Sequence, residues 1–372
     1  MQSQNIIKKF EEWKMLFDKD VLEEFTTNLS GILWLKIKSI VRKEFLQDFI
    51  VLNKLNVKAT KSTDIFKELY ILLSKNIDSG TILLDEYIRS KSTQQIKLLN
   101  ETLLVNELYK LQTFHWGGDY KNALDKHLVD KYIKIYEDYD TIISKLDTSI
   151  QVAVRGYVLC SWYNHWSSIL IENIFKKHPK VLPTVGQIKK VDFFIDNIPF
   201  DLKVTYLPEN FIEKQRKSAG LKPELTVLKQ TAKAIGLYYG ATSKSELYDL
   251  IVAKLTDSKS DLAEATLTEI KNFRMNLIES IKQNPKELIL NLYEEQGELR
   301  FDASNRLFLL LVDTNLFSDS WKLKRNTQEL YPVIQQYLDQ FNVQNIEKLR
   351  VDFTYKDKGD FSAFSDLIIV TK

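Results

Sequence analysis

The hydrophobic and polar positions divide the chain into a long helical part, a short strand region, a second helical part and a closing region of strands. Apolar residues recur every three or four positions near the N-terminus, as at Phe10, Trp13 and Phe17, which is the period of a helix buried on one face. We therefore expect a helical N-terminal domain over residues 1–149. Its helices are predicted at 6–25, 32–53, 62–75, 81–88, 94–111 and 128–146.

A longer amphipathic helix is predicted for residues 150–177, and Pro179 stops it. One face carries two tryptophans followed by Leu170 and Ile174. The opposite face carries a row of small polar residues that ends at Glu172, because positions three and four apart in a helix lie on the same side. This helix leads directly into the strand region.

The strand region is predicted to be a tight hairpin with strands at 191–195 and 198–205, preceded by a short strand or bend at 181–190. The two residues between the strands are Asp and Asn, which tolerate a left-handed backbone. Side chains alternate between the faces of a strand, so Asp201 and Lys203 share one face. We expect Asp192 to join them at one end of the hairpin.

Charged side chains in half-buried strands require partners or a metal ion. Mg²⁺ takes oxygen ligands, commonly one or two carboxylates together with water and substrate phosphate. Asp192 and Asp201 are candidate carboxylate ligands, and the backbone carbonyl of Leu202 is a candidate third ligand. Lys203 is then placed to orient or deprotonate a metal-bound water. The alternative is an exposed hairpin with a surface Asp–Lys pair, and the spacing alone fits both.

Asp192 followed by Asp201-Leu202-Lys203 resembles the motif of the PD-(D/E)XK nuclease superfamily, to which many type II restriction endonucleases belong. The first half reads Val-Asp here, where the motif has Pro-Asp. The resemblance implies a Mg²⁺-dependent endonuclease, active also with Mn²⁺, that hydrolyses double-stranded DNA in restriction or phage defence. It implies catalytic roles for Asp192, Asp201 and Lys203. It also implies an acid on the preceding helix, where Glu172 stands, although a solvated helix face is the alternative for that residue.

The order of the remaining elements extends this resemblance. After residue 205 the chain reads as helical to about residue 297, and a continuous apolar run at 306–313 predicts a strand buried on both faces. A helix at 328–341 and strands at 349–355 and 365–370 follow. The order is similar to the α-β-β-β-α-β core of the superfamily. It implies an α/β (α+β) fold with a mixed central sheet flanked by helices, in a catalytic domain of residues 150–372 with a helical insertion at 207–297.

The net charge of the 372-residue chain is only +2, so a DNA-binding surface has to arise from folding rather than from composition. Two-fold cutting of duplex DNA favours a homodimer, with a monomer left open. The single cysteine, Cys160, lies in an apolar run and reads as a core residue. With no signal peptide or membrane span in view, we expect a cytoplasmic protein. The expected phosphate contacts are Lys189, Lys190, Lys214, Arg216, Lys217, Lys322, Lys324 and Arg325.

Two other classes of function compete with the nuclease. One is a non-catalytic DNA-binding or interaction protein on a nuclease-like fold, and the other is a helical scaffold in which the hairpin is incidental. The acids and the lysine of the motif are all present, which favours an active enzyme over a decayed one. A mixed sheet would argue against the helical scaffold.

Overall fold

The computed structural model describes residues 2–19, 21–114, 124–188, 190–240, 244–296 and 302–372. Its fold is mixed α/β, as expected, with helices arranged around a six-stranded sheet. The strands are β1 (Val181–Ile188), β2 (Val191–Ile195), β3 (Ile198–Thr205), β4 (Arg306–Val312), β5 (Arg350–Tyr355) and β6 (Gly359–Thr371).

Helices precede, interrupt and follow the sheet. Those before it are α1 (Gln2–Asp18), α2 (Glu23–Thr26), α3 (Leu29–Ser39), α4 (Lys43–Leu52), α5 (Ser62–Leu73), α6 (Ile77–Lys97), α7 (Glu101–Tyr109), α8 (Leu124–Leu128), α9 (Tyr139–Lys145) and α10 (Gln151–Lys176). Two short π-helical segments, Val129–Ile133 and Leu146–Ile150, extend α8 and join α9 to α10. The later helices are α11 (Glu209–Ser218), α12 (Glu224–Ala234), α13 (Lys244–Ser258), α14 (Asp261–Gln283), α15 (Lys286–Glu294) and α16 (Thr327–Gln340), with 3-10 helices η4 (Phe317–Arg325) and η5 (Val343–Leu349).

The sheet has the strand order β1-β2-β3-β4-β6-β5. The first three strands form an antiparallel meander, β4 and β6 continue it in parallel with β3, and β5 closes the sheet antiparallel to β6. The predicted mixed sheet is thereby confirmed. The turn between β2 and β3 consists of Asp196 and Asn197, whose φ angles of 46° and 71° are left-handed, as a two-residue hairpin turn of this hand requires.

Two apolar cores cover the two faces of the sheet. Helices α10 and α16 pack on one face through residues such as Ile174 and Ile334. Helices α11, α14 and α15 pack on the other through residues such as Phe211 and Tyr293. Every residue of β4 is buried, so the prediction of a strand enclosed on both faces is confirmed.

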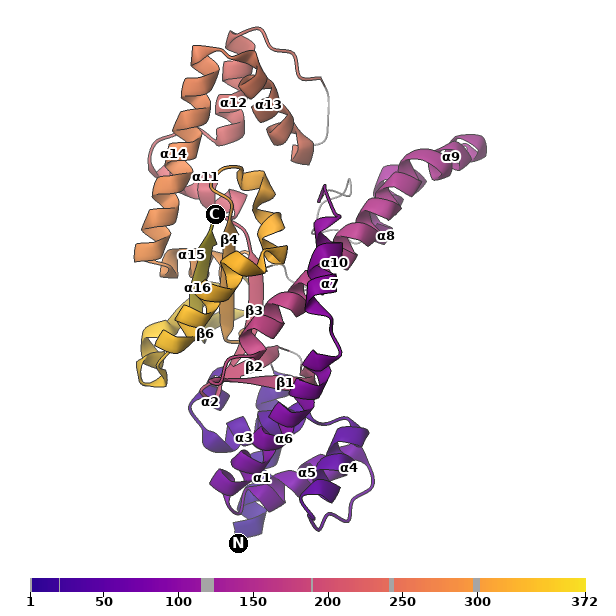
Figure 1. Ribbon diagram of the computed structural model, residues 1–372, viewed down its shortest axis with the longest axis vertical. Coiled ribbons are helices and arrows are strands. Elements are labelled where there is room, and N and C mark those ends of the chain that lie inside the picture. The colour runs from indigo at the N-terminus through magenta and orange to yellow at the C-terminus, as the bar shows by residue number, and fades with distance from the viewer. Residues whose placement is uncertain (1, 20, 115–123, 189, 241–243, 297–301) are drawn as a thin grey trace.

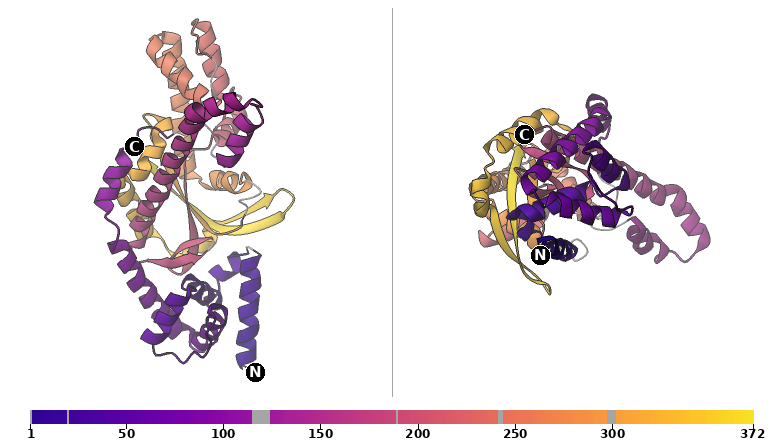
Figure 2. Two further views of the ribbon diagram at one scale, coloured as in Figure 1. Left: turned by 90° about the vertical axis from the view of Figure 1, so that its right-hand side faces the viewer. Right: turned by 90° about the horizontal axis from the view of Figure 1, so that it is seen from below.

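The N-terminal helices form a third core around Trp34, and this core also takes in Leu182 of β1 and Phe194 of β2. Beneath it the Lys36 ammonium, which has no exposed surface, donates hydrogen bonds of 2.7 Å to Asp85 and to the Asn197 side chain. Figures 1 and 2 show these helices at one end of the molecule and α12 to α14 at the other, with the sheet between them.

Several predicted helix boundaries in the N-terminal part were wrong. The helix expected at 32–53 is broken between α3 and α4, whereas the break expected at 89–93 is absent and α6 runs through it. There the Thr93 hydroxyl bonds to the Arg89 carbonyl within the helix, and the Arg89 guanidinium anchors on the Pro179 and Val181 carbonyls. The expected domain boundary at residue 149 falls inside the run from α9 to α10. None of the described helices is long and apolar enough to cross a bilayer.

Candidate functional site

The candidate site lies where two neighbouring strands separate. β2 and β3 pair as far as Phe193 and Phe200, and from Asp201 onward β3 pairs with β4 instead. We call this point the fork, and define it by Asp192, Asp201 and Leu202. Strand separation leaves backbone groups of β2 and β3 without each other as partners, so side chains at the fork have to satisfy them.

Asp192 of β2 satisfies a backbone N–H group of β3. Its carboxylate accepts a 2.7 Å hydrogen bond from the backbone N–H of Leu202, and its own backbone carbonyl accepts one from the Thr184 hydroxyl. Burial, and then the negative charges of Asp201 and Glu172, raise the pKa of Asp192 to about 7. The carboxyl is therefore poised to change charge near neutral pH.

Asp201 is more deeply buried, with 5% of its surface exposed. Lys203, on the same face of β3, donates a 2.7 Å hydrogen bond to its Oδ1. The Lys203 side chain is 46% exposed, so it contacts the buried Asp201 carboxylate while remaining accessible to solvent. The predicted gathering of Asp192, Asp201 and Lys203 at one end of the hairpin agrees with this geometry.

A second charged layer supports Asp201, and it was not foreseen from the sequence. Arg306 pairs with Asp201 in the parallel ladder, donates to Asp302 at 2.9 Å, and stacks on the Tyr293 ring with its guanidinium carbon 4.9 Å from the ring centre. The one available signal was a charged residue at the start of an otherwise apolar strand, because a buried charge requires a partner.

Glu172 comes to the fork from α10. Its side chain is 27% exposed and accepts a 2.8 Å hydrogen bond from Lys176. It is close enough to Asp192 for its charge to contribute to the raised pKa of that carboxyl. The charges of Glu172 on α10 and Asp201 on β3 thus both act on Asp192 of β2, although Glu172 keeps its own lysine partner.

The residues at the fork suit a divalent cation in charge and in donor type. Their oxygens are hard ligands of the kind that Mg²⁺ prefers, and mutual repulsion of the acids is what a cation would relieve. Within the described ranges, however, no group of three acidic, histidine or cysteine side chains converges tightly enough to hold a metal ion. The Asp192 carboxylate is turned towards the Leu202 amide, so binding requires it to turn or to share that contact.

The eight basic residues expected to contact DNA fall into different environments. Lys189 lies outside the described residues. Lys190 has a left-handed φ of 75° and is half-buried, and this burial lowers the pKa of its ammonium. The charges of Asp302 and Asp201 act on the ammonium as well, so Lys190 lies near the fork. Lys214 and Lys217 are exposed on α11. Lys322 is half-exposed and paired with Asp319 at 2.6 Å.

The remaining three are enclosed by protein, and we assign them structural roles in place of DNA contacts. Arg216 donates to the Lys222 carbonyl and to Glu269. Arg325 donates to two backbone carbonyls at the end of α7 at 2.7 Å. Lys324 donates to Asn164, and burial lowers its pKa to about 8. For Lys324 and Arg325 the expectation failed because η4 turns them inward against α7 and α10, and for Arg216 because α14 covers that side of α11. Such burial depends on segments that are distant in the sequence.

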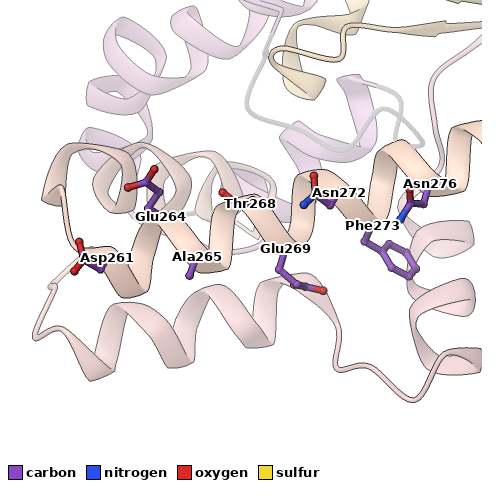
Figure 3. A pocket seen from close by; sticks show the side chains of 8 residues that line it. All are labelled: Asp261, Glu264, Ala265, Thr268, Glu269, Asn272, Phe273 and Asn276. Atoms are coloured by element: carbon purple, nitrogen blue, oxygen red, sulfur yellow. The ribbon is translucent and has the colours of Figure 1, made fainter.

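A surface depression lies elsewhere, along one side of α14 (Figure 3). It holds about 850 Å³ and is open. Acidic and amide side chains dominate it, so it does not suit a phosphate backbone. Its lining residues are Asp261, Glu264, Ala265, Thr268, Glu269, Asn272, Phe273 and Asn276.

Comparison with protein families, with curated proteins and with solved structures finds no match for this chain. Its function is therefore inferred from the fork and from the arrangement of the elements around it.

Proposed function

We propose that this protein is a metal-dependent endonuclease of the PD-(D/E)XK type, acting on double-stranded DNA with Mg²⁺ or Mn²⁺. The observation that carries the proposal is the convergence of Asp192, Asp201 and Lys203 at the fork, with Glu172 adjacent on α10. A surface Asp–Lys pair would not account for two buried acids whose charges oppose each other.

The arrangement of the elements supports the same proposal. A long helix is followed by an antiparallel three-stranded meander, by helices, and by a strand that adds in parallel to the third strand. This order is similar to the α-β-β-β-α-β order that the motif implies. The helices between β3 and β4 include the insertion, β6 and β5 extend the sheet beyond β4, and α16 packs on one of its faces.

The chemistry follows from the positions of the side chains. Asp192 and Asp201 would hold the cation, with the Leu202 carbonyl as a further candidate ligand. A cation bound there acts as a Lewis acid and lowers the pKa of its water. Lys203 is held by Asp201 at 2.7 Å and reaches solvent, so it can orient the attacking water and balance the charge that develops on the phosphate.

The direct test is cleavage of plasmid, phage and oligonucleotide DNA in Mg²⁺, in Mn²⁺ and in EDTA. RNA substrates are tested separately under the same conditions. We expect nicking or linearisation with either metal, none in EDTA, and none by Asp201→Asn. A parent protein that cuts no substrate with either metal would contradict the proposal.

A non-catalytic DNA-binding protein on the same fold is the second candidate. The observation that favours it is the absence, among the described residues, of three metal-ligating side chains that converge. It predicts DNA binding without cleavage, unchanged in Asp201→Asn. The cleavage experiment with that variant separates the two candidates.

A further inference from the structure

One part of the helical insertion concentrates positive charge in a chain that is otherwise balanced. Residues 214–240 contain six basic residues and a single acid, Glu224, whereas the whole chain has a net charge of +2. The segment covers the second half of α11, all of α12 and the loop that follows; the first half of α11 carries Glu209 and Glu213. A local excess of this size is invisible in the overall composition.

Two arginines form ion pairs between these helices and α14. Glu224 is 5% exposed and binds Arg274 of α14 at 2.6 Å. The buried Arg216 of α11 binds Glu269 of α14 at 3.1 Å. These pairs hold α11 and α12 against α14 and neutralise one another, so the outer charge of the two helices is set by their exposed lysines and by Glu209 and Glu213 at the start of α11.

The outer side consists of lysines. Lys214 and Lys217 are exposed one turn apart on α11, and Lys229 and Lys233 one turn apart on α12. Lys222 lies between the helices, since its carbonyl accepts from Arg216 and its ammonium donates to Gln230. Within the described ranges none of these five has a carboxylate within ion-pair distance. We call Lys214, Lys217, Lys222, Lys229 and Lys233 the lysine surface.

The rest of the surroundings favours a polyanion over a membrane. The side chains between the lysines on the outer side of α12, such as Thr226, Gln230 and Ala234, are small or polar and exposed, so there is no apolar stripe to insert into lipid. The depression along α14 carries the acids Asp261 and Glu264 (Figure 3), so the part of the bundle that attracts phosphate is confined to α11 and α12.

We propose that the lysine surface binds the phosphate backbone of duplex DNA and holds it for the fork, so that the insertion is the principal docking element of the protein. This inference rests on the proposed nuclease function. α11 begins at Glu209, shortly after β3 ends at Thr205, so the strand that carries Asp201 and Lys203 leads directly into the lysine surface. Phosphate contacts position a duplex without reading its sequence.

The test measures binding of a labelled random-sequence duplex in EDTA, over a series of salt concentrations. One variant replaces all five lysines of the lysine surface with Gln. A matched control replaces five exposed lysines of the N-terminal part of the chain with Gln: Lys9, Lys43, Lys58, Lys61 and Lys75.

We expect the first variant to bind at least about tenfold more weakly near 0.1 M salt. The slope of log Kd against log salt should fall by up to about 0.9 for each phosphate that a lysine no longer neutralises. The control should bind as the parent does. Equal binding by the parent and the lysine-surface variant, or equal weakening in both variants, would overturn the inference. So would binding of the parent to anionic phospholipid vesicles but not to DNA.

Measuring binding and cleavage separately allows the lysine-surface inference and the nuclease proposal to be refuted independently. If the parent cuts DNA and the lysine-surface variant binds it normally, the inference is wrong and the nuclease proposal stands. If the parent binds DNA through these lysines and never cuts it, the docking surface stands and the nuclease proposal is wrong. All ten substituted side chains are exposed, so we expect neither variant to change the fold. Circular dichroism checks this.

Discussion

Arg306 lies directly beside Asp201 on the adjacent parallel strand, with its Nε 3.8 Å from the Asp201 Oδ2 and both side chains almost completely buried. Its Nε makes no hydrogen bond within the described structure, whereas its Nη2 is held by Asp302. The guanidinium thus supplies positive charge to Asp201 without occupying the carboxylate's hydrogen-bonding positions, which leaves oxygen lone pairs of Asp201 available to Lys203 and to a cation.

The first prediction concerns this pair. Arg306→Gln should lower the free energy of unfolding by about 3–5 kcal/mol, because removing one partner leaves buried carboxylates without compensation. Urea denaturation measures it. The control is Arg350→Gln, whose pair with Glu23 is partly exposed and which should cost about 0–1 kcal/mol. A loss at Arg306 no larger than that at Arg350 would show that the buried charges are satisfied by other means.

The second prediction concerns the raised pKa of Asp192, which is about 7 in the folded protein and near 4 in the unfolded chain. Between these values the folded state binds the extra proton, so stability falls as the pH rises from about 4 to 7 and stays lower above 7. Asp192→Asn should remove this loss. We expect it to match the parent near pH 4 and to exceed it by about 2–4 kcal/mol at pH 8 in urea unfolding.

The control for this measurement is Asp257→Asn on the exposed end of α13, expected to change stability by less than about 0.5 kcal/mol at either pH. An Asp192→Asn protein that is no more stable than the parent at pH 8 would show that the carboxylate is not strained by its surroundings.

The third prediction concerns metal binding. A cation at the fork has to displace the Asp192 proton, so Mg²⁺ affinity measured by calorimetry should weaken below pH 7, by up to about tenfold for each pH unit. Above pH 7 it should level off. Asp201→Ala should abolish the binding. An affinity that does not change with pH, or that survives in Asp201→Ala, would place the cation elsewhere.

The fourth prediction separates two roles of Glu172. As a member of the acid cluster, Glu172→Gln should slow cleavage by about 10²-fold and move the acidic limb of the pH–rate profile to lower pH, because it removes one charge that raises the Asp192 pKa. Lys176→Gln frees the Glu172 carboxylate and should move that limb to higher pH. Unchanged activity and profile in both variants would mean that Glu172 and Lys176 form only a helix-surface pair.

The fifth prediction distinguishes binding from chemistry at Lys203. Lys203→Ala should bind Mg²⁺ and DNA almost as the parent does, yet cut at least about 10²-fold more slowly. Lys203→Arg should not restore the rate, because its planar head is permanently charged and shaped differently from an ammonium. Single-turnover cleavage provides the measurement. A normal rate in Lys203→Ala would remove the central residue of the nuclease proposal.

The hairpin was predictable from the sequence because all its determinants are local. A short apolar run defines β2, alternating apolar residues define β3, and Asp196-Asn197 defines the turn. The convergence of Asp192, Asp201 and Lys203 follows from that register. Helix boundaries near α3 and α6 were not predictable to the same degree, because the anchoring of Arg89 on residues far along the chain decides one of them.

The supporting layer of the site depends on distant segments, and sequence patterns carry no information about these contacts. Arg306 lies beside Asp201 because β4 docks beside β3, and Tyr293 stacks on Arg306 because α15 covers that face. For the same reason a run of basic residues in η4 was taken for a surface. Lys324 and Arg325 are enclosed by α7 and α10, which lie more than a hundred residues away.

The buried Lys36 has a consequence for the alignment of the acids at the opposite end of the hairpin. A slip of one residue between β2 and β3 would carry Asp192 or Asp201 to the other face of the sheet. Lys36 donates a hydrogen bond to the Asn197 side chain, which is 161 residues away in the sequence. A change of register that moved the β2–β3 turn would break this hydrogen bond and leave the buried ammonium paired with Asp85 alone. The N-terminal helices therefore stabilise the register of β2 and β3 from outside the sheet. Through that register, Lys36 favours the placement of Asp192 and Asp201 on one face without contacting either acid.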